Sequence, residues 1–180
     1  MKLARIQAGG IFVSDEPALV RTVLGSCVAA CLFDPVAKIG GMNHFMLPDG
    51  SSDAGAPTRY GVYAMELLIN GIMQKGGSRF RLKAKVFGAS HVLLLNTDSL
   101  AVPARNISFI RKFLADERIP AVAQQLGGNR PLDVAFETHS GHARVRAFGW
   151  GTITRDIVQR ERRYQQELNE EPPKSVVTLF

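Results

Sequence analysis

Cysteine is scarce in this chain, which has only Cys27 and Cys31 among its 180 residues. Two cysteines four residues apart cannot form a disulfide framework, and we expect both to stay reduced. Long apolar runs are also missing. No stretch approaches the roughly 18 residues that would span a bilayer, and the first ten residues are too weakly apolar for a secretory signal. These absences predict a cytoplasmic protein with free thiols.

Phosphate-binding loops and standard zinc spacings are absent as well. None of the paired glycines lies in a G-x-x-x-x-G-K or G-x-G-x-x-G pattern, so we interpret them as turns. A strand would separate Cys27 and Cys31 by roughly 13 Å, too far for one tetrahedral ion. His139 and His142 flank a Ser-Gly turn without a zinc-type spacing. We therefore expect no metal.

Basic residues are abundant and unevenly placed, and the formal net charge is +6. Between Glu66 and Asp98 there is no acid, and residues 79–86 alternate cations with apolar side chains, which predicts a strand with one basic face. That face is either solvated or a docking surface for an acidic partner. Its cations are not interleaved with exposed aromatics, which argues against nucleic-acid binding. The candidate docking residues are Arg79, Arg81, Lys83 and Lys85.

The pattern of apolar residues predicts a mixed α/β or α+β fold. Residues 1–154 are expected to form one domain, and residues 155–180 a polar C-terminal helix and partly flexible tail to which we assign no chemistry. Helices are predicted at 58–74, ended by Gly76-Gly77, and at 103–116. Strands are predicted at 3–7, 20–24, 27–33, 39–46, 80–87, 120–126, 132–138 and 143–149.

The stretch TVLGSCVAACLF, residues 22–33, places Cys27 directly after Gly-Ser in an apolar, strand-like run. If this run forms a hairpin with the next one, with Phe33 opposite Lys38, then Cys27 falls opposite His44. Directly opposite residues hold their Cβ atoms about 4.5–5.5 Å apart on one face, so a thiol and an imidazole could meet. A slip of one residue would separate them, so the prediction depends on the register.

A thiol beside an imidazole can act as a nucleophile, because the imidazole takes the thiol proton. Gly25 lets the chain approach a substrate closely, and the N–H groups of Ser26 and Cys27 are candidate donors to an oxyanion. Thr22 is the nearby candidate for orienting the imidazole. The alternative is that Cys27 is a core residue, as we expect for Cys31, and that His44 is an interior histidine.

A longer series of motifs resembles one known family. TVLGSCVAACLFDPVAKIGGMNHFMLP, residues 22–48, is similar to the active-site segment of the chemoreceptor glutamine deamidases, the CheD family. The resemblance continues through RYGVYAMELLINGIMQKGG, KAKVFGAS, ARNISFIRKFL and LGGNRPLDVAFETHSG, and so covers about residues 5–149. It implies layered mixed β-sheets with flanking helices, similar to the catalytic domain of cytotoxic necrotising factor toxins.

The resemblance also implies an activity, that of a protein-glutamine glutaminase acting on methyl-accepting chemotaxis receptors. Cys27 would be the nucleophile that forms a thioester, His44 the acid and base, and Thr22 the third residue, with no cofactor. Hydrolysis of receptor glutamate methyl esters by the same route is also implied. The alternative is a non-catalytic module that binds a CheC-type chemotaxis phosphatase.

Overall fold

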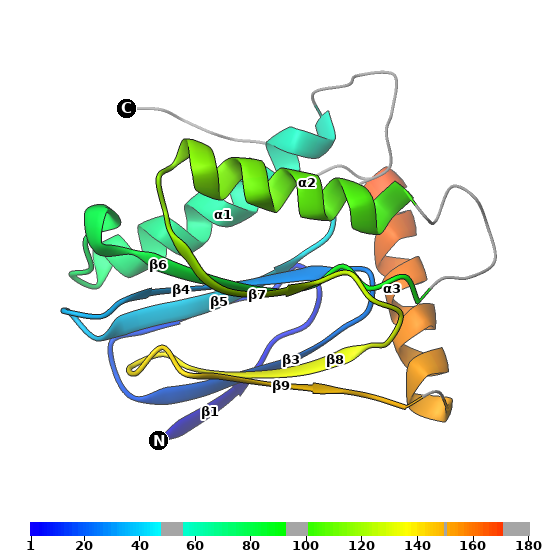
Figure 1. Cartoon of the computed structure of the whole chain (residues 1–180), viewed down its shortest axis with the longest axis horizontal. Coiled ribbons are helices and arrows are strands. Elements are labelled where there is room, and N and C mark those ends of the chain that lie inside the picture. Colours follow the sequence, from blue (N-terminus) through cyan, green and yellow to red (C-terminus); the bar gives the residue numbers. More distant parts are fainter. Residues whose placement is uncertain (48–55, 93–100, 150, 171–180) are drawn as a thin grey trace.

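Two β-sheets lie face to face in the computed structural model, which describes residues 1–47, 56–92, 101–149 and 151–170 (Figure 1). One sheet has the order β1 (Lys2–Arg5), β3 (Ala18–Leu24), β8 (Leu132–Glu137) and β9 (Ala143–Ala147). The other has the order β2 (Ile11–Ser14), β5 (Ile39–Phe45), β4 (Val28–Asp34), β6 (Lys83–Gly88) and β7 (Ala121–Leu126). Both sheets are mixed, because β1 and β3, and also β6 and β7, run parallel.

The helices cover one face and one end of this sandwich. Helices α1 (Ala56–Gln74) and α2 (Ala101–Asp116) lie over the outer face of the five-stranded sheet, and α3 (Thr152–Glu170) crosses one end of both sheets (Figure 1). Among the described helices, none is both long and apolar enough to cross a membrane. The layered α+β arrangement predicted from the sequence is confirmed.

Strand β4 shows why the layers stack in this order. All of its residues are buried, and it is hydrogen-bonded to β5 on one side and β6 on the other. Val28 and Leu32 pack in the cluster under α1 and α2, whereas Ala29 and Cys31 pack in the cluster between the sheets. Because successive strand residues point to opposite faces, an uninterrupted apolar run is what a strand covered on both sides requires.

Most predicted elements are present, with changes at their ends. The helices predicted at 58–74 and 103–116 are confirmed and begin two residues earlier than expected, at Ala56 and Ala101. Strand β2 was not predicted, since it is a four-residue edge strand that pairs only with β5. The predicted loose tail beyond residue 170 lies outside the described residues.

The prediction of a basic strand at 80–87 is wrong over its first three residues. Residues Arg79–Arg81 form a 3₁₀ turn, and the strand begins only at Lys83. Phe80, expected on the apolar face, is fully exposed at 100 %. The turn is fixed by ion pairs: Arg79 with Glu66 at 3.0 Å and with Glu117 at 2.5 Å, and Arg81 with Asp34 at 2.7 Å.

The predicted hairpin register is also wrong. Asp34 extends β4 and pairs with Ile39, so the turn comprises residues 35–38, with Lys38 in the left-handed region at φ 58°. His44 therefore lies opposite Ala29 rather than Cys27. Positions 27 and 29 have the same parity, so Cys27, just before the strand begins, still projects toward the face that carries His44.

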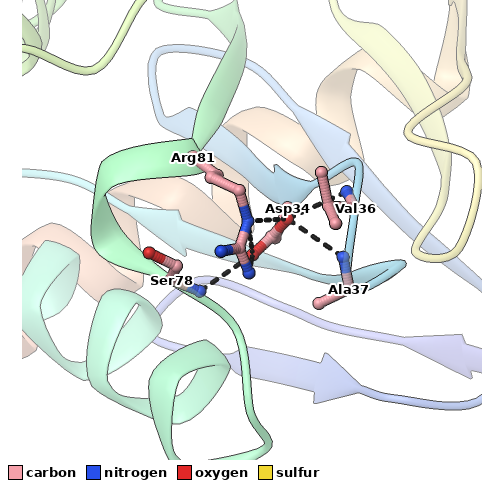
Figure 2. A network of polar contacts seen from close by, with 5 residues as sticks. All are labelled: Asp34, Val36, Ala37, Ser78 and Arg81. Atoms are coloured by element: carbon pink, nitrogen blue, oxygen red, sulfur yellow. Dashed lines mark hydrogen bonds and ion pairs between the residues drawn. The ribbon is translucent and has the colours of Figure 1, made fainter.

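The side chain of Asp34 explains the displaced turn (Figure 2). Its carboxylate is fully buried and accepts hydrogen bonds from the Nε and Nη2 of Arg81. It also accepts from the backbone N–H groups of Val36, Ala37 and Ser78, at 2.9, 3.1 and 2.8 Å. Burial alone would raise the pKa of Asp34, but the hydrogen bonds from Arg81 and the backbone outweigh it and hold the pKa well below its usual range.

Replacing Asp34 with alanine is expected to lower the free energy of unfolding by about 3 kcal/mol or more. The change leaves backbone donors and a guanidinium without their common acceptor. Urea unfolding at neutral pH measures the loss. The control is Asp15→Ala, which removes the exposed pair with Lys75 and should cost at most about 1 kcal/mol. Equal losses in the two variants would contradict this account of the turn.

Candidate active site

Three of the predicted site residues come from separate segments that meet between the two sheets. Thr22 lies on the inward, buried face of β3 in the four-stranded sheet. His44 lies on β5 of the five-stranded sheet, and Cys27 lies in the crossover that carries the chain from β3 to β4. The sandwich therefore brings together residues that no single hairpin contains.

The hydroxyl of Thr22 determines which nitrogen of His44 carries the proton. Thr22 Oγ1 lies 2.9 Å from the carbonyl oxygen of Ile6 and 2.7 Å from His44 Nδ1. A carbonyl only accepts, so the single hydroxyl hydrogen goes to Ile6 and the oxygen accepts from Nδ1–H. Nε2 then keeps its lone pair. It is buried and has no hydrogen-bond partner within the described part of the chain.

Cys27 and His44 lie close together beside a residue that was not predicted, Glu161 of α3. The Cys27 sulfur, a ring nitrogen of His44 and a carboxylate oxygen of Glu161 all lie within 4.8 Å of one another. Cys27 is 0 % exposed, and His44 and Glu161 are each 4 % exposed. In this arrangement the thiol is closed off from solvent, and the imidazole is almost completely buried.

The segment 25–27 turns its carbonyl groups to one side and its N–H groups to the other. The carbonyls accept hydrogen bonds from the domain interior: Ser90 N–H to Gly25 at 2.7 Å, Asn106 Nδ2 to Ser26 at 2.9 Å and Ala89 N–H to Cys27 at 2.7 Å. This leaves the N–H groups of the segment directed away from the interior. Their orientation is therefore fixed before any substrate arrives.

The carboxylate of Glu161 accepts from these N–H groups. Its donors are the Gly25 N–H at 2.7 Å, the Ser26 N–H and hydroxyl at 2.7 Å each, and the Cys27 N–H at 3.3 Å. A Cβ at position 25 would lie only 2.6 Å from Glu161 Oε2, so only glycine fits there with α3 in place. The segment is an anion-binding site, and α3 supplies the anion.

The surroundings keep both reactive groups neutral in this arrangement. Burial raises the pKa of the Cys27 thiol well above its usual value, and the charge of Glu161 and its hydrogen bond with the thiol raise it further. Burial lowers the pKa of His44 to about 3. The pair is therefore a thiol and a neutral imidazole rather than an ion pair.

Three side chains lie close enough together to ligate a metal ion, because Cys27, His44 and Glu161 each offer one ligand atom. Both carboxylate oxygens of Glu161 already accept backbone hydrogen bonds, and ligation would require Cys27 as a thiolate. Sequence reasoning considered Cys27 with Cys31 instead, and missed this set. The expectation of a site without metal stays a prediction.

The other predicted site residues lie elsewhere. Lys83 and Lys85 pair with Phe33 and Cys31, toward the end of β4 away from Cys27. Arg79 and Arg81 hold the ion pairs described above. A docking role for these four cations stays a prediction.

Comparison with known proteins gives a consistent result. The family model described as CheD chemotactic sensory transduction matches residues 46–147. A protein of Xanthomonas axonopodis pv. citri named probable chemoreceptor glutamine deamidase CheD is 45 % identical over 94 % of this chain and 84 % of its own length. Proteins with the same name from Stenotrophomonas maltophilia (strain K279a) and Burkholderia orbicola (strain MC0-3) are 44 % and 52 % identical over 93 % and 75 % of this chain, and 84 % and 56 % of their own lengths.

Among solved structures, the hypothetical protein YfiH of Bacillus licheniformis matches with a TM-score of 0.39 and 14 % identity. The match covers 66 % of this chain and 49 % of that one, a likeness too slight to carry an argument.

Proposed function

The chain belongs to the CheD family, and we propose that it deamidates glutamine side chains of methyl-accepting chemotaxis receptors in the cytoplasm. The relatives described above are named probable chemoreceptor glutamine deamidases, and that name gives chemoreceptor glutamines as their substrate. The single observation that carries the chemistry is Cys27 within 4.8 Å of a ring nitrogen of His44, an imidazole whose Nε2 keeps its lone pair, next to backbone N–H groups that hold a carboxylate.

The proposed reaction runs through a thioester. Nε2 of His44 takes the Cys27 proton, and the sulfur attacks the carbonyl carbon of the glutamine amide. The N–H groups of segment 25–27 stabilise the oxyanion, and the imidazolium protonates the departing ammonia. His44 then takes a proton from water, which attacks the thioester. The carbon–sulfur bond breaks, releasing glutamate and the Cys27 thiol.

The test uses a purified cytoplasmic fragment of a receptor from the same organism, incubated with catalytic amounts of the chain. Peptide mass spectrometry is expected to show a gain of about one mass unit at specific glutamines, with an equal amount of ammonia released. If receptors carry glutamate methyl esters, the same thioester route should release methanol. Binding to the receptor or to a CheC-type phosphatase, without editing of any cognate receptor, would favour the regulatory binding module instead.

Thr22→Val is expected to lower the deamidation rate by about 10²-fold, the lower end of what general acid–base catalysis is worth. Valine keeps the shape of the side chain but removes the oxygen that accepts from Nδ1–H. The loss of this acceptor favours the His44 tautomer that carries its proton on Nε2. In that tautomer Nε2 has no lone pair with which to take the thiol proton. The control is Thr22→Ser, which retains the hydroxyl and should stay within a few-fold of wild type. A valine variant as active as the serine variant would exclude this orienting role.

A further inference from the structure

Helix α3 has an amphipathic stripe with a carboxylate at its centre. Ile157, Glu161 and Leu168 are buried, Tyr164 is half-buried, and they recur at spacings of three and four residues on one face. Such a stripe normally consists of apolar residues. Burying an ionised carboxylate costs several kcal/mol unless strong donors replace its water. Here the donors are the N–H groups of segment 25–27 and the Ser26 hydroxyl, so the protein provides a specific binding site for the Glu161 carboxylate.

The accommodated group is chemically the product of the proposed reaction. Deamidation turns a glutamine side chain into a glutamate side chain, and Glu161 presents a glutamate side chain beside Cys27. Its oxygens accept from the same N–H groups that would hold the oxyanion. The family resemblance implies that the edited part of the receptor is its cytoplasmic helical region, and Glu161 also comes from a helix.

Helix α3 also blocks the approach to the reactive pair. With α3 in place Cys27 is 0 % exposed and His44 only 4 %, so no receptor side chain can reach the sulfur. A cleft of about 600 Å³ runs between α3 and the sheets and opens onto both His44 and Glu161. Its walls include Arg21, Thr22 and Val23 of β3, and Ile157, Arg160 and Tyr164 of α3.

We propose that α3 occupies the groove in which a receptor helix docks, with Glu161 as an internal product analogue that competes with the receptor. This inference rests on the proposed function. The contact between the hydroxyl groups of Tyr164 and Tyr60 secures the helix one turn beyond Glu161. Displacement of α3 by a receptor helix would expose Cys27 and free the anion site for the substrate carbonyl.

The first test measures the reactivity of Cys27 in the full chain with alanine at position 161. Glu161→Ala removes a negative charge and a hydrogen bond that disfavour the thiolate, so alkylation of Cys27 by iodoacetamide should accelerate about tenfold or more. The KM for the receptor fragment should fall correspondingly. Cys31 serves as the internal control for unfolding, and Glu170→Ala, at an exposed position of the same helix, as the matched variant. Unchanged alkylation of Cys27 would overturn the proposal.

The second test converts the product analogue into a substrate. In Glu161→Gln, the Cys27 sulfur is expected to attack the side-chain amide at position 161, releasing ammonia. Water then hydrolyses the thioester and leaves a glutamate there, with a gain of about one mass unit. The double variant with Cys27→Ala should keep the amide. A merely structural role for Glu161 would not produce this conversion. If the amide at position 161 persists in Glu161→Gln while receptor glutamines are edited, the placement of the Glu161 side chain in the substrate position would be overturned.

The two readouts separate failure of this inference from failure of the proposed function. Receptor editing by wild type together with unchanged Cys27 alkylation in Glu161→Ala would reject the role of α3 alone. Faster alkylation and self-conversion without editing of any cognate receptor would reject the receptor as substrate and retain α3 as the occupant of the site.

Discussion

Replacing Cys27 with alanine is expected to lower the rate of receptor deamidation by about 10⁴-fold or more. The sulfur forms the covalent bond to the substrate in the proposed reaction, and Cys27 is the thiol of the set in which Cys27, His44 and Glu161 lie within 4.8 Å of one another. Ammonia release from a receptor fragment, followed under conditions in which wild type completes many turnovers, measures the loss. The residual rate of Cys27→Ala should come only from stabilisation of the oxyanion by segment 25–27 and from binding of the receptor.

The matched control for this prediction is Cys31→Ala. Cys31 is also fully buried in the cluster between the sheets, and burial likewise raises its pKa. It lies opposite Met42, however, and four residues from the anion site. Its loss should cost about 1–2 kcal/mol of stability through a small cavity, with activity close to that of wild type. A large loss of activity in Cys31→Ala, or retained activity in Cys27→Ala, would contradict the assignment of the nucleophile.

Replacing His44 with glutamine is expected to lower the deamidation rate by about 10²–10⁴-fold, the usual value of general acid–base catalysis. Glutamine is neutral and can still hydrogen-bond to Thr22, but it cannot take the proton of Cys27. The loss should appear in kcat rather than in KM, because His44 acts on protons during the chemical steps. A variant with wild-type kcat would remove His44 from the mechanism.

The same variant should alter the pH dependence of stability. The pKa of His44 falls from an ordinary value near 6.5 to about 3 on folding, so the unfolded chain binds more protons between these values. The stability from this residue is therefore present above pH 6.5 and lost as the pH falls toward 3. Between pH 7 and 5, wild type should lose about 2 kcal/mol more than His44→Gln in urea unfolding. Equal losses would show that His44 is not buried as a neutral group.

The meeting of Cys27 and His44 could be predicted from the sequence despite a wrong register. The predicted turn was displaced by one position, because the side chain of Asp34 holds the turn in a way that alternation of apolar residues does not encode. The turn moved by one position in each strand, so the pairing partner of His44 moved by two, from Cys27 to Ala29. Because residues two apart on a strand point to the same face, Cys27 and His44 stayed on the same face. The hydrogen bond from Asn106 to the Ser26 carbonyl could not be predicted, because no pattern in the sequence around Asn106 indicates it.

Glu161 was missed for a different reason. A charged residue in a polar C-terminal helix is normally solvated, and its donors lie more than 130 residues away in the chain. The one available signal was its place in the stripe of Ile157, Tyr164 and Leu168. The interrupted alternation at Arg79–Arg81 was missed similarly, because ion pairs to three separate segments, not β-propensity, determine that turn.

The most direct test of the central claim, that Cys27 attacks the receptor glutamine, is intact-protein mass spectrometry of samples quenched with acid during turnover. We expect a covalent species whose mass is that of the chain plus the receptor fragment less about 17 mass units, the mass of ammonia. It should form with wild type and Cys31→Ala, disappear on treatment with hydroxylamine, and be absent with Cys27→Ala. Turnover by Cys27→Ala at the wild-type rate, without a covalent species in either protein, would contradict the claim.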